Sequence, residues 1–358
     1  MPKLDELLVK MVKSGASDLH LLAGEPVRMR IDGDLRRVSD KPLESEALTA
    51  LMRELCRDDQ WRRYVRNKDL DFAYGVKGVS RFRCNYLNQL RGPGAVFRVI
   101  PEDITPLAKL DMPDAVTGIS EFTRGLVLVT GPTGSGKSTT LAALIHAINS
   151  SESRHIITVE DPVEFVHKGL KSYIVQREVG VHTKGFSHAL RDALLQDPDV
   201  VMVGEMRDME TISQAITAAE MGVLVFGTLH TNSASKTIDR IIDTFPLSEK
   251  DQIRGLLAGS LRAIIAQQLL RRSDRRGRIV AVELLLGGPG LGNIIRDGNA
   301  AKLHSYIESN RGQGMQAMDS SLRSLVKQGV VMPEDAFLKC NDKQRFEKWL
   351  EERDQSTT

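Results

Sequence analysis

The chain has 358 residues, of which 41% are hydrophobic and 27% are charged, a composition of ordinary globular proteins that leaves room for two domains. A net charge of +2 gives no indication of a nucleic acid or an anionic membrane as partner. Three scattered cysteines without a C-x-x-C pair predict neither a disulfide framework nor a zinc site, which fits a reducing cytoplasm. Since no run of 18 apolar residues is present, we expect any membrane association to go through a partner.

The chain begins with the pattern of a helix followed by short strands. Apolar residues at helical spacing predict a helix over 3–14, and alternation predicts a strand over 17–22. Asp32-Gly33 separates two alternating runs, 27–31 and 35–38, and is a strong signal for a two-residue turn. These two runs are therefore predicted to pair as a hairpin.

The same region continues with another helix and another hairpin. We predict one helix over 44–66, a hairpin formed by 69–76 and 79–90, and a last strand over 95–100. Prolines then punctuate a linker over 101–122 that is not rich in glycine and serine. The sequence thus predicts a small α+β domain followed by a jointed connection rather than a flexible tether.

From residue 124 onward strands alternate with helices, which indicates a parallel sheet covered by helices. We predict four strands, over 126–130, 155–159, 200–203 and 223–229. Between them we predict helices over 137–149, 186–196 and 209–221, the last with Asp208 as its N-cap. Beyond residue 247 the pattern is mostly helical, with helices predicted over 249–271, 315–328, 333–339 and 343–352.

The stretch after the first of these strands matches G-x-x-x-x-G-K-[ST], the phosphate-binding loop. An apolar strand precedes it and a helix follows it, an arrangement in which backbone N–H groups and the helix N-terminus can bind phosphate. Lys137 is predicted to reach the β- and γ-phosphates of ATP, and the Ser138 hydroxyl to bind Mg²⁺. The predicted nucleotide-binding residues are Gly131, Pro132, Thr133, Gly134, Ser135, Gly136, Lys137, Ser138 and Thr139.

Acidic residues follow two of the other predicted strands. Three carboxylates stand within Glu160–Glu164, and the apolar segment Asp199–Val203 leads to Glu205, as in a Walker B segment with Glu in place of the usual Asp. Each could be a solvated loop acid, but ligands bind at the carboxyl ends of the strands in parallel sheets. His230 follows a third strand, where it could serve the site or simply form a structural hydrogen bond.

Three arginines of the N-terminal region form a possible further part of the site. Arg81 and Arg83 alternate along one predicted strand and Arg98 stands on the next, so all three could share a face. They could form a solvated cationic face, or stabilise the charge that develops on a transferred phosphoryl group. In the second case the two domains must meet across the nucleotide, either within one chain or between chains.

These motifs, in this order, resemble those of the secretion-superfamily ATPases, and most of all the type IV pilus retraction ATPases that drive twitching motility. The resemblance implies a RecA-like P-loop ATPase of the α/β class with a smaller PAS-like α+β N-terminal domain and a helical C-terminal region. The implied boundaries are 1–100, a linker at 101–122, the ATPase core at 123–285 and the helical region at 286–358. The segments that carry the resemblance are Ser17–His20, Gly131–Thr139, Glu160–Glu164, Gln176–Gly180, Asp197–Asp208 and Gly227–Asn232.

The resemblance also implies roles for particular residues. Glu164 corresponds to the general base that acts on water, Glu205 to the Walker B acid that helps to hold Mg²⁺, and His230 to the histidine of the histidine box. Arginines at positions typical of the family are expected to act as nucleotide sensors or as fingers from a neighbouring subunit. They are Arg81, Arg83, Arg98 and Arg240.

The implied assembly is a homohexameric ring on the cytoplasmic side of the inner membrane. There it would act on a pilus platform protein, with a paralogous retraction ATPase as a further possible partner and with neither nucleic acid nor membrane insertion. The three scattered cysteines argue against the assembly and type II secretion ATPases, which carry a tetracysteine zinc insertion.

Three positions depart from the family pattern. Leu195 and Gly292 replace arginines, and Val223 replaces the second histidine of the histidine box. These departures leave open whether the chain is the main retraction motor or an accessory paralogue. Two other readings remain: a nucleotide-sensing module with weak turnover, and a nucleic-acid translocase on the same core, against which the near-neutral charge argues.

Overall fold

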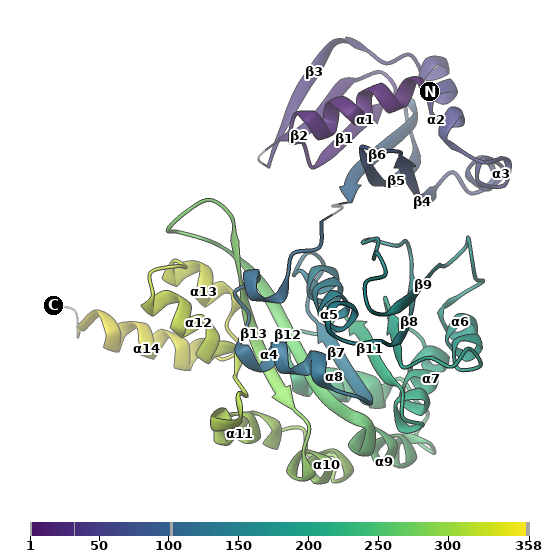
Figure 1. Cartoon of the computed structure of the whole chain (residues 1–358). Helices are drawn as coiled ribbons and strands as arrows, with labels where there is room; N and C mark the ends of the chain where they lie inside the picture. Colours follow the sequence, from purple (N-terminus) through teal and green to yellow (C-terminus); the bar gives the residue numbers. More distant parts are fainter. Residues whose placement is uncertain (1, 32, 101–102, 356–358) are drawn as a thin grey trace. The chain divides into compact units, whose positions relative to one another are not determined.

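The computed structural model describes residues 2–31, 33–100 and 103–355, and two units can be distinguished in it (Figure 1). The first consists of Met1–Asp103 and Pro162–Val166, and the second of Ile104–Asp161 and His167–Thr358. The expected turn residue Asp32 and the first two residues of the expected linker, 101–102, lie outside the described residues.

A six-stranded antiparallel sheet forms the centre of the first unit, with the order β3-β2-β1-β6-β5-β4. The predicted first helix, both pairs of hairpin strands and the last strand are confirmed. Its elements are α1 (Lys3–Lys13), β1 (Asp18–Leu22), β2 (Pro26–Ile31), β3 (Asp34–Pro42), α2 (Ser45–Leu55), α3 (Asp58–Asn67), β4 (Leu70–Val76), β5 (Ser80–Gln89) and β6 (Gly92–Ile100).

The single helix predicted over 44–66 is wrong, because the chain forms two helices there. Cys56 and Arg57 both have extended backbone dihedrals, which interrupts the i to i−4 hydrogen bonds between α2 and α3. The Arg57 N–H donates to Oε1 of Gln60 at 3.1 Å, so the second helix begins with its own side-chain cap. The apolar spacing continues across the break, which is why periodicity alone does not reveal it.

The two faces of this sheet differ because successive side chains of a strand point to opposite sides. One face is apolar and packs with residues of α1 and α2 in a single buried cluster. Tyr86 is fully buried there and makes edge-to-face contacts with Phe72 and Phe97, with ring centroids 5.1 and 6.1 Å apart. The opposite face carries the arginines described below.

A seven-stranded sheet of order β13-β12-β7-β11-β10-β8-β9 forms the centre of the second unit. All neighbouring strands are parallel except β12 and β13. The strands are β7 (Gly125–Thr130), β8 (His155–Glu160), β9 (Tyr173–Glu178), β10 (Val200–Val203), β11 (Leu224–Leu229), β12 (Leu261–Arg271) and β13 (Arg278–Leu286). The helices along it are α4 (Asp114–Gly118), α5 (Lys137–Ser151), α6 (Phe186–Ala193), α7 (Met209–Glu220), α8 (Ala234–Asp243) and α9 (Lys250–Ser260).

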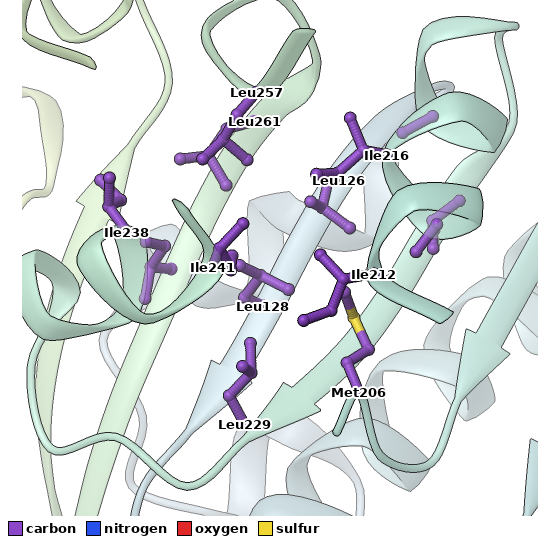
Figure 2. Packing of buried hydrophobic residues seen from close by; sticks show 14 of the residues in the cluster. Leu126, Leu128, Met206, Ile212, Ile216, Leu229, Ile238, Ile241, Leu257 and Leu261 are labelled. Atoms are coloured by element: carbon purple, nitrogen blue, oxygen red, sulfur yellow. The ribbon is translucent and has the colours of Figure 1, made fainter. Parts of the chain in front are cut away.

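Helices cover both faces of the seven-stranded sheet, as the continuous apolar runs of its strands require. Val127 and Val129 of β7 pack on the α5 side, whereas Leu126 and Leu128 pack on the side of α7, α8 and α9. Figure 2 shows the second side, where the β7 leucines lie among side chains of these helices. The labelled partners include Met206, Ile212, Ile216, Leu229, Ile238, Ile241, Leu257 and Leu261.

The helix predicted over 249–271 is wrong in its second half. The helix α9 ends at Ser260, and Leu261–Arg271 is a strand that pairs in parallel with β7. Ile264 packs on one face of the sheet and Ile265 on the other, so this run is a strand buried on both sides. Neither β13 nor β9 was predicted; their short apolar runs carry no clear period.

The C-terminal region is helical, as predicted. It contains α10 (Pro289–Arg296), α11 (Lys302–Ser309), α12 (Met318–Lys327), α13 (Pro333–Lys339) and α14 (Lys343–Gln355). Met318 and Leu322 of α12 pack with Phe346 of α14 against the far part of β12 and β13 in a separate cluster. Within the described residues, no helix is both long enough and apolar enough to cross a bilayer.

Candidate active site

The predicted site residues of the second unit follow strands that end at one edge of the sheet. Thr130 of β7 pairs with Leu229 of β11. Val203 of β10 in turn pairs with Gly227 of β11 and with Val159 of β8. The phosphate-binding loop, Glu205 and His230 therefore follow their strands at nearly the same level as Glu160, the last residue of β8. This is the edge at which parallel α/β sheets bind ligands.

Glycine is required at two positions of the phosphate-binding loop. Gly131 has φ of 145°, and a Cβ placed on it would overlap the backbone oxygen of Gln267 and Oγ of Ser135. Gly136 has φ of 92° and caps the N-terminus of α5. The two glycines let the backbone turn back sharply before the helix starts, which aims N–H groups into the loop.

The polar groups of this loop fit nucleotide phosphates. Nζ of Lys137 donates to the carbonyl oxygens of Gly131 and Pro132 at 2.8 and 3.1 Å, so its charge lies across the mouth of the loop. The hydroxyl of Ser135 is buried and has no hydrogen-bond partner among the described residues. Because buried polar atoms are normally paired, this hydroxyl is free to donate to a phosphate oxygen held in the loop. Oxygen donors suited to Mg²⁺ are available from Ser138 and from Glu205.

Glu205 is the centre of a charged cluster next to this loop. Its Oε1 lies 3.0 Å from Nε2 of His230 and 2.5 Å from Nε of Arg207. Burial by itself works to raise the pKa of Glu205, but the hydrogen bond and charge of Arg207, with the charges of His230 and Lys137, hold that pKa below its usual range. Glu205 is therefore a carboxylate at neutral pH, as a metal-binding acid must be.

The turn that presents Glu205 is attached to β11. The Thr228 hydroxyl donates to the Gly204 carbonyl at 2.6 Å, and the Met206 N–H donates to the Thr228 carbonyl at 3.0 Å. Gly227 has no side chain at the place where Sδ of Met206 lies, and a Cβ there would overlap that sulfur. These contacts bring Glu205 and His230 together from two neighbouring strands.

The acidic segment after β8 divides between the two units. Glu160 is buried in the second unit, where its Oε1 accepts hydrogen bonds from Thr158 at 2.7 Å and from Gln176 of β9 at 3.2 Å. Glu164 belongs to the first unit, is partly exposed, and lies with Oε1 4.0 Å from Nη1 of Arg83. The surroundings of Glu164 thus differ from those of Glu160, because Glu164 is partly exposed and lies near Arg83.

Arg81, Arg83 and Arg98 share one face of the six-stranded sheet, as the sequence indicated. Arg83 pairs directly with Arg98 in the register of β5 and β6, and Arg81 stands two residues earlier on β5. We call the surface formed by these three residues the arginine face. Arg240, the fourth predicted arginine, is exposed on α8 of the second unit.

Two aspartates hold the arginine face in place. Asp71 of β4 accepts hydrogen bonds from Arg83: Oδ2 accepts from Nη2 at 2.6 Å and from Nε at 3.1 Å, and Oδ1 accepts from Nε at 3.3 Å. Asp18 of β1 is almost fully buried and accepts a hydrogen bond from Nε of Arg98 at 2.8 Å. Both aspartates were missed as site-related residues, although the alternation of β1 and β4 places them on the same face.

Gln267 of β12 is a further residue that sequence reasoning missed. Its Nε2 donates to the backbone oxygen of Ser135 at 2.7 Å, and its side chain is fully buried. Ala266 pairs with Thr130, which places Gln267 beside the start of the loop. A polar side chain inside the apolar run of β12 is the available signal, but the spacing of that run predicts a helix.

Comparison with known proteins places this geometry in context. A family model described as "Type II/IV secretion system protein" matches residues 1–283. The "Type IV pilus retractation ATPase PilT" of Pseudomonas aeruginosa is 48% identical over 343 residues, which cover 96% of this chain and 99% of that protein. A "Twitching motility protein" of Neisseria gonorrhoeae is 48% identical over 308 residues, covering 86% of this chain and 82% of that protein.

The fold also matches a solved structure over nearly its whole length. The structure of the pilus retraction motor PilT with bound ADP is similar with a TM-score of 0.89 and 44% sequence identity. The match covers 96% of this chain and 98% of that one.

Proposed function

Because the chain belongs to the type II/IV secretion system protein family and is an ATPase of that family, we propose that it powers type IV pilus retraction, and thereby twitching motility. The observation that carries this proposal is the meeting of the phosphate-binding loop with the Glu205–His230 pair at one sheet edge. An acid at that place can organise the hydrolysis of a bound nucleoside triphosphate.

Within this site each residue has a distinct proposed role. Residues Gly131–Thr139 bind the phosphates, and Lys137 would leave the loop carbonyls to contact the β- and γ-phosphates. Ser138 and Glu205 would hold Mg²⁺, which would neutralise charge on the phosphate oxygens. His230 orients Glu205 through the contact between Nε2 and Oε1. Glu164 acts as general base on the attacking water.

Arg81, Arg83 and Arg98 are proposed to complete the site from outside the ATPase core, whereas Arg240 belongs to the core itself. The arginine face belongs to an N-terminal domain, so in a homohexameric ring one subunit can supply these groups to its neighbour. We retain the division into an N-terminal domain at 1–100, a linker at 101–122, a core at 123–285 and a helical region at 286–358. Hydrolysis would then rotate the N-terminal domain relative to the core about the linker.

The work of such a ring must be delivered to a membrane-embedded partner. We propose a cytoplasmic, peripheral location at the inner membrane, where the ring acts on a pilus platform protein. A paralogous retraction ATPase is a further possible component.

Deletion of the gene in the source organism tests this function, scored by surface pili and by twitching. Retraction predicts excess pili that do not retract, together with loss of twitching. Absence of pili would indicate assembly instead, and an unchanged phenotype would contradict both roles.

A second test separates a motor from a nucleotide-sensing module. If the chain is a motor, the steady-state ATP turnover of the wild type exceeds that of Glu164→Gln by about 100-fold or more, the range typical of an essential general base. Equal, slow turnover by both proteins would contradict the motor.

A further inference from the structure

A buried carboxylate far along the sequence from the motifs connects the candidate active site with the C-terminal helices. Glu283 stands on β13, and its side chain is only 4% exposed. No motif includes it. Across the sheet it pairs with Ala266, which itself pairs with Thr130, so it lies at the level where the phosphate-binding loop begins.

Each oxygen of Glu283 accepts a hydrogen bond from the first residue of a different helix. Oε1 accepts from the N–H of Ala234, the first residue of α8, at 2.7 Å. Oε2 accepts from the N–H of Met318, the first residue of α12, at 3.3 Å. The positive ends of both helix dipoles therefore point at one carboxylate, which favours its charge. Burial raises the pKa of Glu283, and the two N–H donors oppose that rise.

The helix α8 is the element that follows His230. Ser233 caps its N-terminus by accepting from the Lys236 N–H at 3.3 Å, and its carbonyl accepts from the Thr237 hydroxyl at 2.7 Å. The Thr237 hydroxyl also lies 2.7 Å from that of Thr231. The loop from His230 to Ser233 is thus fixed at one end by β11 and at the other by the first turn of α8.

We propose that Glu283 is a positioning residue for ATP hydrolysis. Glu283 fixes the start of α8 and hence the position of His230. Because Glu283 also binds α12, the position of His230 depends on α12. The inference rests on the ATPase activity. It deepens the proposed function by naming a path through which a load on the C-terminal helices can reach the Glu205–His230 pair. Displacement of α12 would withdraw one donor from Glu283 and shift the carboxylate that holds α8.

Glu283→Gln tests this role because an amide has only one oxygen. It can accept from one helix but must turn its NH₂ group toward the N–H of the other. Ser321→Ala is the matched control. The Ser321 hydroxyl accepts from the Val282 N–H at 3.1 Å, so it attaches α12 to the same strand without touching α8.

We expect Glu283→Gln to lower kcat about tenfold, the effect of misplacing a group outside the chemistry, with less than a twofold change in KM. Ser321→Ala should leave kcat within about twofold of the wild-type value, even if it lowers Tm as much as Glu283→Gln does. Both are measured in the full chain by steady-state turnover and thermal unfolding. If Glu283→Gln does not fold, Glu283→Asp takes its place. This variant has a side chain shorter by one methylene group, which moves the carboxylate away from the two helices, and we expect the same loss of kcat.

A double-mutant cycle with His230→Ala identifies the path. Because Glu283 acts through His230, Glu283→Gln should lower kcat little further in the His230→Ala background. Multiplicative losses, or equal kcat losses in Glu283→Gln and Ser321→Ala, would overturn the inference while leaving the ATPase intact. A wild-type chain without turnover would overturn the proposed function, and this inference with it.

Discussion

The two sheets of this protein place their functional groups differently. The seven-stranded parallel sheet is buried on both faces and presents its polar groups at one edge, where Gly131, Glu205 and His230 follow successive strands. The six-stranded antiparallel sheet is buried on one face and presents Arg83 and Arg98 on the other. In the first sheet strand direction gathers the site, whereas in the second the alternation of side chains does so.

This difference has consequences for stability as well as function. Groups at the edge depend on turns and on their neighbours, such as Gln267 and Thr228. Groups on the face depend on ion pairs with Asp71 and Asp18. The arginines of these pairs are open to solvent, which weakens the pairs. Perturbing the edge should therefore have larger effects than perturbing the face.

The largest effect is expected from Lys137→Ala at the edge. Loss of the cation that contacts the phosphates should lower kcat/KM for ATP by at least about 100-fold, as loss of one oriented donor does in other sites. Lys236→Ala, an exposed lysine on α8, is the control and should retain activity. The prediction is checked by measuring the ATP turnover of both variants. Comparable activity would show that the phosphate-binding loop takes no part in hydrolysis.

A smaller effect is expected from Gln267→Ala, which leaves the buried Ser135 carbonyl without its donor. The looser loop should weaken nucleotide binding about tenfold, in line with a lost buried hydrogen bond of 1–3 kcal/mol. Its neighbour provides a matched control, because Nε2 of Gln268 donates to the Lys339 carbonyl at 3.1 Å on the other side of the strand. Titration with labelled ADP should separate them; equal affinities would show that Gln267 serves stability alone.

Asp71→Asn probes the arginine face and should have a weaker effect. The amide can no longer form the paired, charge-assisted contact with Arg83, so the guanidinium is less well oriented. We expect kcat to fall about two- to fivefold, the scale of a solvent-exposed ion pair. Asp69→Asn, an exposed neighbour, is the control. A loss as large as that of Lys137→Ala would contradict the ranking of edge over face.

The smallest effect concerns acid stability through Asp18. Burial works to raise the pKa of Asp18, but hydrogen bonds from Ser17 and Arg98, together with the charges of Arg98 and His20, outweigh it and hold the pKa below its usual range. The charged form is therefore favoured in the folded state. Its stabilisation is present above the ordinary pKa of an aspartate and is lost as the pH falls through the lower, folded-state pKa.

The variant Asp18→Asn should lack this component, so its stability should change less with pH below about pH 4. Urea unfolding followed at several acidic pH values measures the difference. An identical pH dependence for wild type and variant would show that Asp18 carries no such contribution.

The edge of the parallel sheet was predictable from sequence because its signals are local. The motif at Gly131–Ser138 directly follows its strand in the chain, and the acids and the histidine likewise stand next to their own apolar strands. Strand direction alone then brings them to one edge. The shared face of Arg83 and Arg98 was predictable for a similar reason, since period-two alternation and hairpin pairing fix it.

The parts that escaped prediction depend on tertiary contacts. The strand Leu261–Arg271 follows directly from α9, and its apolar residues suit a helix equally well until β7 is placed beside it. The positions of Gln267 and Glu283 near the candidate site can be recognised only once β12 and β13 are known to pair. Asp18 and Asp71 gained significance only when the register placed them beside arginines.

The proposal that edge and face serve one reaction in neighbouring subunits has a direct test. Mixing Lys137→Ala chains with chains in which Arg81, Arg83 and Arg98 are all alanine tests it directly, since each variant should be inactive alone. In randomly mixed rings, about one quarter of the sites combine an intact loop with intact arginines from the neighbour, so ATP turnover should return to about a quarter of the wild-type value. A mixture no more active than the average of its two components would contradict the claim, as would full activity of the arginine variant alone.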